Sequence, residues 1–327
     1  MLQSKRNKSV KWWLVIKLML ALIAFWFIYR KVIIHESSGN YLFQMETALL
    51  NTKSTLLFVV VFILMILNWT TEALKWKYMI RKIESISTGR SLEAVFSGLT
   101  VSLFTPNRIG EYAGRVFHLS EGRRMQGTFI TVIENSSQLL VTILSGSVAC
   151  MIYIKDYMEI DSWIFLLLRF MLVALSVFCL ILYFNLDLLE KAFRKFRLSD
   201  YWQKIFHVFS LYSKMELLKV LFLSIIRYVI FSIQFYMLLR IYGCTFQFLQ
   251  GFLMIAMTFF VMSVVPTFAI TEIGVRGAIS AFFFGKLTND VLPVLNATFS
   301  LWLINLAIPA LIGTFFIFHF RLESKAK

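Results

Sequence analysis

The sequence predicts an all-α, polytopic membrane protein. Of its 327 residues, 59% are hydrophobic and only 16% are charged, and a soluble domain of this size cannot bury that much apolar surface. The apolar residues form runs about as long as a bilayer is thick. The charges collect in the gaps between these runs, so the net charge of +15 indicates membrane topology and lipid contact, and no nucleic-acid partner is expected.

Six apolar stretches are long enough to cross a membrane, since a span needs about 20 mostly apolar residues. They are roughly 12–29, 56–79, 128–154, 163–184, 217–242 and 294–320. The first follows a basic segment, as in a signal peptide, but no small-x-small cleavage site comes after it. We therefore expect it to be an uncleaved helix. Two further stretches, 91–119 and 249–284, are apolar but interrupted.

The basic residues give the orientation. Twenty lysines and arginines lie in one alternating set of gaps, counting Lys75, and five lie in the other set. By the positive-inside rule, the richer set and both termini are cytoplasmic. This assignment requires each interrupted stretch to return to the side from which it starts, so we predict that both are re-entrant helical hairpins.

The order helix, hairpin, helix then occurs twice, in residues 56–154 and 217–320, and the two units enter the membrane from opposite sides. This is an inverted-topology repeat, within a single domain covering 1–327. In transporters such repeats place the substrate site where the broken segments meet, near the bilayer midplane.

Prolines and glycines mark the expected breaks in the hairpins. Pro106 cannot continue a helical hydrogen-bond ladder, and Gly110 relaxes the backbone after it. Pro266 and Gly274 occupy comparable places in the second hairpin. Gly110 and Gly114 also form a small-x-x-x-small pattern, for which close helix packing is the favoured interpretation.

If helix resumes after Pro106, the residues Arg108, Glu111, Arg115 and His118 lie on one face. Such a polar stripe cannot face lipid and must face protein or a wet cavity. The planar guanidinium of arginine suits a phosphate diester, and Glu111 can hold Arg115 in position. The alternative is that Glu111 and Arg115 only neutralise each other and lock the hairpin.

The second hairpin repeats this pattern, with Glu272 and Arg276 following Pro266. Two Glu-x-x-x-Arg segments, each just after a proline in an otherwise uncharged apolar stretch, are hard to assign to chance. We take Glu272 and Arg276 as candidate headgroup-binding residues as well.

Other polar residues within the spans indicate a polar interior. Glu134 and Gln138 share a helix face, and an acid within the membrane is a functional candidate by default. Glu134 is a candidate switch, for proton coupling or arginine pairing, and interhelical hydrogen bonding is the alternative. Arg227 lies in the middle of its span and is a candidate supporting residue. Further polar positions in the spans are Asn68, Glu72, Lys75, Gln234 and Asn305.

No enzymatic motif is found. The sequence has no nucleophile with its base, no acidic metal motif and no Gly-rich phosphate loop. The cysteines and histidines lack the spacing of a metal site, so no metal or cofactor is expected. Only a few residues follow the last span, so no soluble catalytic domain is expected. The cytoplasmic stretch 185–215 is either an interfacial amphipathic helix or an ordinary basic loop.

Two segments carry a family resemblance: Thr105-Pro106-x-x-x-Gly110-Glu111-x-x-x-Arg115 and Ile273-Gly274-Val275-Arg276-Gly277. They resemble the flippase-like transmembrane region of the lysylphosphatidylglycerol synthase family, over nearly the whole chain. In the best understood relatives this region translocates aminoacylated phosphatidylglycerol, and a separate cytosolic domain, absent from this sequence, synthesises it. The acid of the second hairpin lies on the other side of its arginine from the family pattern.

The leading hypothesis is a bacterial inner-membrane lipid flippase or lipid-binding transporter and not an enzyme. Arg115 and Arg276 would engage an anionic headgroup, with Glu111 and Glu272 orienting them. The alternatives are a membrane-embedded enzyme or enzyme partner in polyprenyl-phosphate or phospholipid glycosylation, and a non-catalytic scaffold. Membrane lipids are the expected partners, and a homodimer or a partner transferase are both open.

Overall fold

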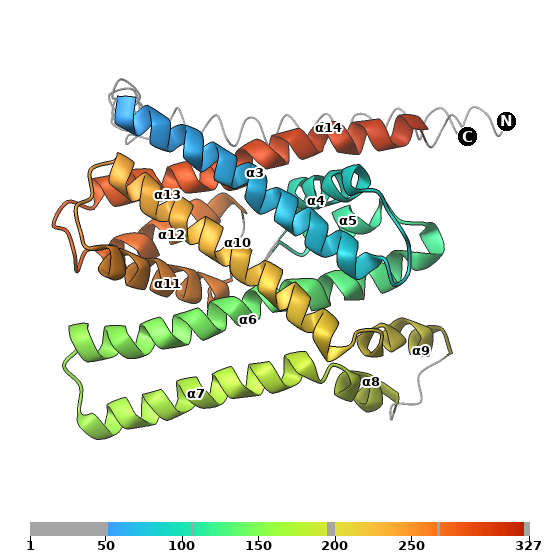
Figure 1. Ribbon diagram of the computed structural model, residues 1–327, viewed down its shortest axis with the longest axis horizontal. Coiled ribbons are helices and arrows are strands. Elements are labelled where there is room, and N and C mark those ends of the chain that lie inside the picture. Colours follow the sequence, from blue (N-terminus) through green and yellow to red (C-terminus); the bar gives the residue numbers. More distant parts are fainter. Residues whose placement is uncertain (1–51, 106–107, 195–199, 267–268, 324–327) are drawn as a thin grey trace.

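The computed structural model describes residues 52–105, 108–194, 200–266 and 269–323, and the predicted span 12–29 lies outside them. The described chain is helical, with no strand among these residues. The helices in order are α3 (Thr52–Ile80), α4 (Thr88–Ser102), α5 (Gly110–Val116), α6 (Arg124–Tyr157), α7 (Ser162–Phe184), α8 (Asp187–Arg194), α9 (Asp200–Phe206), α10 (Lys214–Ile241), α11 (Phe248–Val264), α12 (Ala269–Phe284), α13 (Leu292–Trp302) and α14 (Ile308–Glu323). Figure 1 shows their arrangement.

The long helices coincide with the remaining predicted spans. Four segments in the described chain are long and apolar enough to cross a membrane: α3, α6 with the short turn before it, α7, and α13 with most of α14. The helix α10 is 28 residues long and packs along α3 (Figure 1). Its start is fixed by a capping box, in which Ser213 and Glu216 exchange hydrogen bonds. The chain is therefore a multi-pass membrane protein.

Two helix pairs fold back inside the bundle. The pair α4 and α5 lies at the end of the bundle where α3 ends, and the pair α11 and α12 lies at the end where α10 ends (Figure 1). The helix α4 has 15 residues and α5 has only seven. At about 1.5 Å per residue, neither can cross a hydrocarbon core of about 30 Å.

Glycines allow the helices of the first pair to pack backbone against backbone. A Cβ on Gly114 would lie 2.5 Å from the Cα of Gly98, and a Cβ on Gly110 would lie 2.6 Å from the carbonyl oxygen of Val101. No side chain fits at such distances, so Gly110 and Gly114 are packing residues. In the second pair, α11 ends at Val264 just before Pro266, whereas α12 continues through Gly274 without the expected break.

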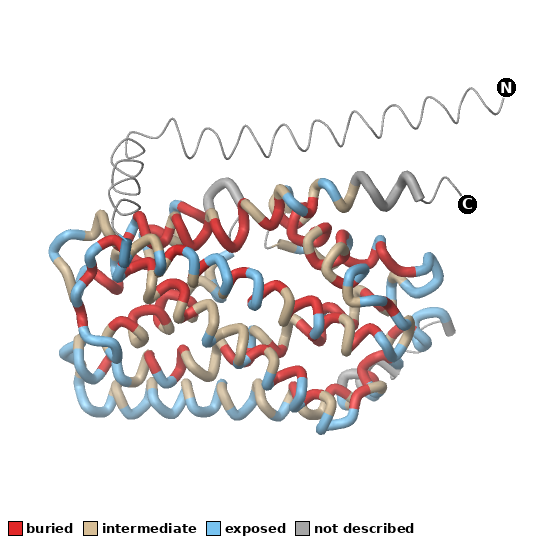
Figure 2. Tube along the Cα trace, turned by 45° about the horizontal axis from the view of Figure 1, so that its top comes forward, coloured by how far each residue is buried: buried red, intermediate tan, exposed pale blue. Residues whose placement is uncertain are grey.

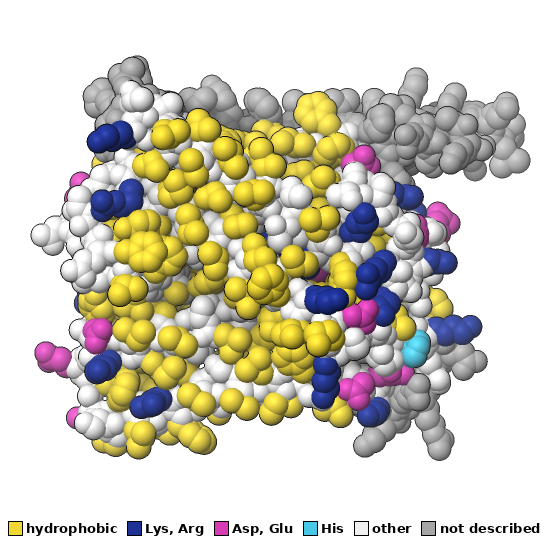
Figure 3. Space-filling view, in the orientation of Figure 1, with side chains coloured by type: hydrophobic (Ala, Val, Ile, Leu, Met, Phe, Trp, Pro, Cys, Tyr) yellow, Lys and Arg dark blue, Asp and Glu magenta, His cyan; other side chains and the backbone are white. Residues whose placement is uncertain are grey.

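The surface has the distribution expected of a membrane protein. A broad apolar band covers the middle of the molecule, and lysines and arginines lie at its two edges (Figure 3). The helix α7 runs along the outside (Figure 2), and no residue of its most apolar 18-residue window is buried. In the segment 185–215, Phe206 and Phe209 pack on Phe129 of α6, with ring centroids 5.3 and 5.9 Å apart, so part of that segment's apolar face contacts protein.

Candidate functional site

The centre of the bundle holds a set of charged side chains that we name the buried charge network. It has three acids and three bases, contributed by α3, α5, α6 and α10. Its members are Glu72, Lys75, Glu111, Arg115, Glu134 and Arg227. Ionised, the network is electrically balanced.

Glu72 and Glu134 are the two acids at the core of this network. Glu72 forms ion pairs with Lys75 Nζ at 3.0 Å and with Arg115 Nη2 at 2.5 Å, and it also pairs with Arg227. Glu134 forms ion pairs with Lys75 Nζ and Arg115 Nη1, both at 2.9 Å. Helical spacing explains part of this arrangement, because Glu72 and Lys75 are three residues apart on one helix face. The other ion pairs of Glu72 and Glu134 join different helices.

Arg115 is fully buried, with none of its side chain exposed, and it pairs with Glu72, Glu111 and Glu134. The predicted Glu111–Arg115 contact is therefore present, but it is part of a larger set. Its guanidinium is thus already neutralised by protein carboxylates. The structure places Arg115 inside the network, where it holds α3, α5 and α6 together.

The position of Lys75 corrects one step of the sequence analysis. Its side chain is fully buried and donates to Ser224 Oγ at 3.3 Å, so it does not belong among the basic residues of the cytoplasmic gaps. Hydropathy misplaced it because it lies at the polar end of an apolar run. The remaining bias is nineteen basic residues against five.

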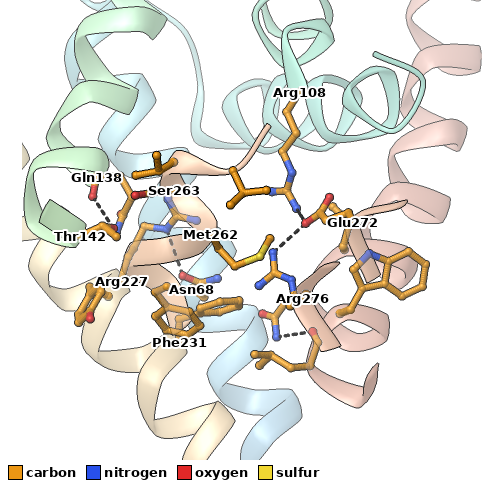
Figure 4. Close-up of a pocket in the computed structure, with 18 of the residues that line it drawn as sticks. Asn68, Arg108, Gln138, Thr142, Arg227, Phe231, Met262, Ser263, Glu272 and Arg276 are labelled. Atoms are coloured by element: carbon orange, nitrogen blue, oxygen red, sulfur yellow. Dashed lines mark hydrogen bonds and ion pairs between the residues drawn. The ribbon is translucent and has the colours of Figure 1, made fainter. Parts of the chain in front are cut away.

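A cavity of about 570 Å³ lies beside the network. Its walls come from α3, α6, α10, α11, α12, the end of α13, the turn before α5, and the π-helical turn Leu303–Ala307 between α13 and α14. Asn68, Gln138, Arg227 and Asn305 line it, and each lies close to the midpoint of its long helix. The cavity is therefore at the mid-depth of the bundle. Figure 4 shows its lining.

Three residues of the cavity wall form what we name the arginine clamp: Arg108, Glu272 and Arg276. Glu272 Oε1 accepts from Arg108 Nη2 at 2.6 Å and from Arg276 Nη2 at 2.7 Å. Arg108 comes from the first helix pair and Glu272 from the second, so this ion pair joins the two pairs (Figure 4). Two cations share one carboxylate, which leaves the clamp with one surplus positive charge.

The polar residues that the sequence placed on one helix face do not share a face in the structure. The helix α5 begins only at Gly110, and Arg108 has φ 58°, a left-handed conformation that ends helical periodicity. Arg108 therefore turns toward Glu272 and away from the face that carries Glu111 and Arg115. His118 lies beyond the end of α5, buried, with its Nε2 3.0 Å from Ser97 Oγ. The face prediction failed because it assumed helix through residue 108.

Arg227 belongs to both clusters. Its Nε donates to Asn68 Oδ1 at 3.1 Å, its guanidinium pairs with Glu72, and it lines the cavity with 15% of its side chain exposed. Gln138 also lines the cavity, whereas Glu134, one turn before it, belongs to the network. Glu134 and Gln138, which the sequence placed on one face of α6, therefore belong to different sites: Glu134 to the buried charge network and Gln138 to the cavity wall.

Two hydroxyl residues in the cavity wall, Thr142 and Ser263, were not singled out from the sequence. Both are ordinary in apolar helices, where hydroxyl groups bond to their own backbone, and Ser263 Oγ does donate to the carbonyl of Phe260. No sequence signal distinguishes them. Within the described ranges, no group of three or more His, Cys, Asp or Glu side chains could hold a metal ion.

Comparison with known proteins gives one finding. The family model described as Lysylphosphatidylglycerol synthase TM region matches residues 14–313. No curated protein and no solved structure matches the chain.

Proposed function

The chain belongs to the family of the lysylphosphatidylglycerol synthase TM region, and on that premise we propose that it is a lipid transporter of the flippase type. The proposed ligand is a lipid with a monoanionic phosphodiester headgroup, bound in the mid-depth cavity. The observation that carries the proposal is the arginine clamp, which presents a surplus positive charge to a cavity of mixed polar and apolar lining at the centre of an apolar bundle.

The chemistry of the clamp suits this ligand. Guanidinium groups bind phosphate oxygens through paired, charge-assisted hydrogen bonds. Because Glu272 neutralises only one of its two arginines, one negative charge from a ligand balances the clamp. The cavity volume of about 570 Å³ lies within the usual range for small-molecule pockets, about 300–1,000 Å³, so it is large enough for a headgroup.

The depth of the cavity supports transport. Polar and charged groups in the centre of a membrane are costly and mark substrate pathways. We interpret the two helix pairs as re-entrant hairpins of an inverted repeat, whose tips meet at the binding site. Arg108 and Val264 at these tips are 40% (side chain) and 73% exposed, which leaves an open side where acyl chains could remain in the lipid.

The proposal keeps the headgroup-binding role expected for Arg108 and Arg276 and changes the roles of Glu111, Arg115 and Glu134. Arg108 and Arg276 bind the headgroup, and Glu272 pairs with both of them in its absence. Glu111, Arg115 and Glu134 hold the bundle together through the network. We place the protein in the cytoplasmic membrane of a bacterium, with both termini on the cytoplasmic side, and we assign it transport without a chemical reaction.

A transport assay tests the proposal. The purified protein is reconstituted into liposomes with fluorescent phosphatidylglycerol, and dithionite quenching reports how fast the lipid changes leaflet. We expect faster exchange with the wild type than with empty liposomes, and slower exchange with Arg276→Gln and Arg108→Gln. The matched control is Arg240→Gln, which removes a positive charge at the end of α10, where Arg240 donates to the carbonyl of Cys244.

Two results would refute the proposal. One is exchange no faster with the wild type than with empty liposomes. The other is exchange that is equally fast in Arg276→Gln, Arg108→Gln and Arg240→Gln, since the clamp would then have no part in it.

A further inference from the structure

Arg227 is the residue that connects the cavity to the buried charge network in the described part of the chain. It lines the cavity, and it pairs with Glu72. Its Nη1 is held by Glu72 and its Nε by Asn68, so an anion that takes up these donors competes with Glu72 for the guanidinium.

When Arg227 binds a ligand, the buried charge network loses one of its three positive charges. The side chains of Lys75, Arg115 and Glu134 are fully buried, and that of Glu72 is 2% exposed. With Arg227 drawn to the ligand, three carboxylates would share two cations. An uncompensated charge at such a buried position is strongly unfavourable, and a buried carboxylate in this situation takes up a proton and becomes neutral.

The arginine clamp behaves differently. If a ligand draws Arg108 away from Glu272, Arg276 still pairs with that carboxylate. The clamp therefore accepts one negative charge with no change in protonation. Binding of the same ligand is therefore expected to involve proton uptake at Arg227 and none at the arginine clamp.

Several helices contribute charged or titratable side chains around Glu72 and Glu134. Lys75, Arg115 and Arg227 face Glu72, and Lys75 and Arg115 face Glu134. Glu111 shares Arg115. Tyr112 of α5 and Tyr183 of α7 lie within electrostatic reach of Glu134, and both are neutral near pH 7. In the described ranges no further cation pairs with Glu72 or Glu134, so none replaces Arg227.

From these contacts we propose that the protein couples its ligand to a proton: binding of a phosphodiester anion to Arg227 is accompanied by uptake of one proton from solvent onto the carboxylate of Glu72 or Glu134. This inference rests on the proposed function for the identity of the cavity's ligand. It adds a proton-binding site and makes the protein a transporter that carries an anionic lipid together with a proton.

The sign of the pH effect follows from this coupling. Because the bound state holds one more proton than the free state, binding strengthens as pH falls. For one proton, the affinity changes by up to about tenfold per pH unit.

Calorimetry measures the proton directly. The detergent-solubilised protein is titrated with dihexanoyl phosphatidylglycerol, a soluble monoanionic phosphodiester, at pH 7 in PIPES and in Tris. These buffers differ in ionisation enthalpy, so the difference between the observed binding enthalpies gives the number of protons taken up. We expect a value near one for the wild type.

Two variants separate the network from the clamp. The double variant Glu72→Gln with Arg227→Gln removes one acid and one base, so the network stays balanced. We expect it to bind the lipid more weakly, with proton uptake near zero. Arg108→Gln is the matched control within the cavity, and we expect weaker binding with uptake still near one.

The outcomes distinguish the two proposals. Binding by the wild type with no proton uptake overturns the coupling and leaves the lipid-binding cavity in place. Absence of binding by the wild type overturns both. Undiminished uptake in the double variant overturns the assignment to Glu72 and Arg227. If that variant does not fold, the wild-type affinity at pH 6 and pH 8 provides the test, and equal affinities overturn the coupling.

Discussion

Replacing Arg115 by glutamine is expected to destabilise the protein strongly. Arg115 is fully buried and pairs with three carboxylates from α3, α5 and α6. Its removal leaves Glu72, Glu111 and Glu134 with only Lys75 and Arg227. Breaking a buried ion pair by removing one partner costs about 3–5 kcal/mol, chiefly because it leaves an uncompensated charge. We expect a decrease of that size in the free energy of unfolding.

A second substitution should recover most of this loss. Among the described ion pairs, Glu111 makes its only one with Arg115, so Glu111→Gln combined with Arg115→Gln leaves two acids and two bases that still pair with one another. The lost hydrogen bonds to Glu72 and Glu134 should then leave a deficit of about 1–2 kcal/mol.

The assay is SDS-induced unfolding in mixed detergent micelles, followed by tryptophan fluorescence. Arg115→Gln as stable as the wild type, or a double variant no more stable than the single one, would show that charge balance does not stabilise this network.

Three further predictions concern packing, binding and topology. Gly114→Ala places a methyl group 2.5 Å from the Cα of Gly98 and should lower the free energy of unfolding by about 1–3 kcal/mol, whereas Gly122→Ala, which meets nothing within 4 Å, should be neutral in the same SDS titration. Glu272→Gln removes the carboxylate that competes for Arg108 and Arg276 and should tighten binding of dihexanoyl phosphatidylglycerol by about tenfold, and weaker binding in calorimetry would contradict the clamp. In a cysteine-free background, Glu121→Cys should react with an impermeant maleimide only from the cytoplasmic side and Asn289→Cys only from the opposite side, and labelling of both from one side would contradict the two re-entrant hairpins.

The sequence was informative about elements and about which residues are unusual. Apolar length predicted α3, α6, α7 and α10, because burying a hydrogen-bonded backbone in lipid requires helices of that length. Charged residues inside apolar runs identified Glu134 and Arg227, since such residues are costly in a membrane.

Partners between helices could not be read from the sequence. Spacing predicted the contact between Glu111 and Arg115, which lie on one helix face, but not the contact between Arg108 and Glu272, which lie 164 residues apart. Nor could it give the left-handed conformation of Arg108.

Thus the sequence by itself determined that the chain is a helical membrane protein with two interrupted, charged segments. Only the tertiary structure decided which charges neutralise each other and which face the cavity: Arg115, one of the arginines expected to bind a headgroup, is enclosed by three carboxylates, while Arg108 and Arg276 share one. The physical reason is that the balance of a buried charge depends on every helix packed around it, and periodicity along one helix contains no information about the others.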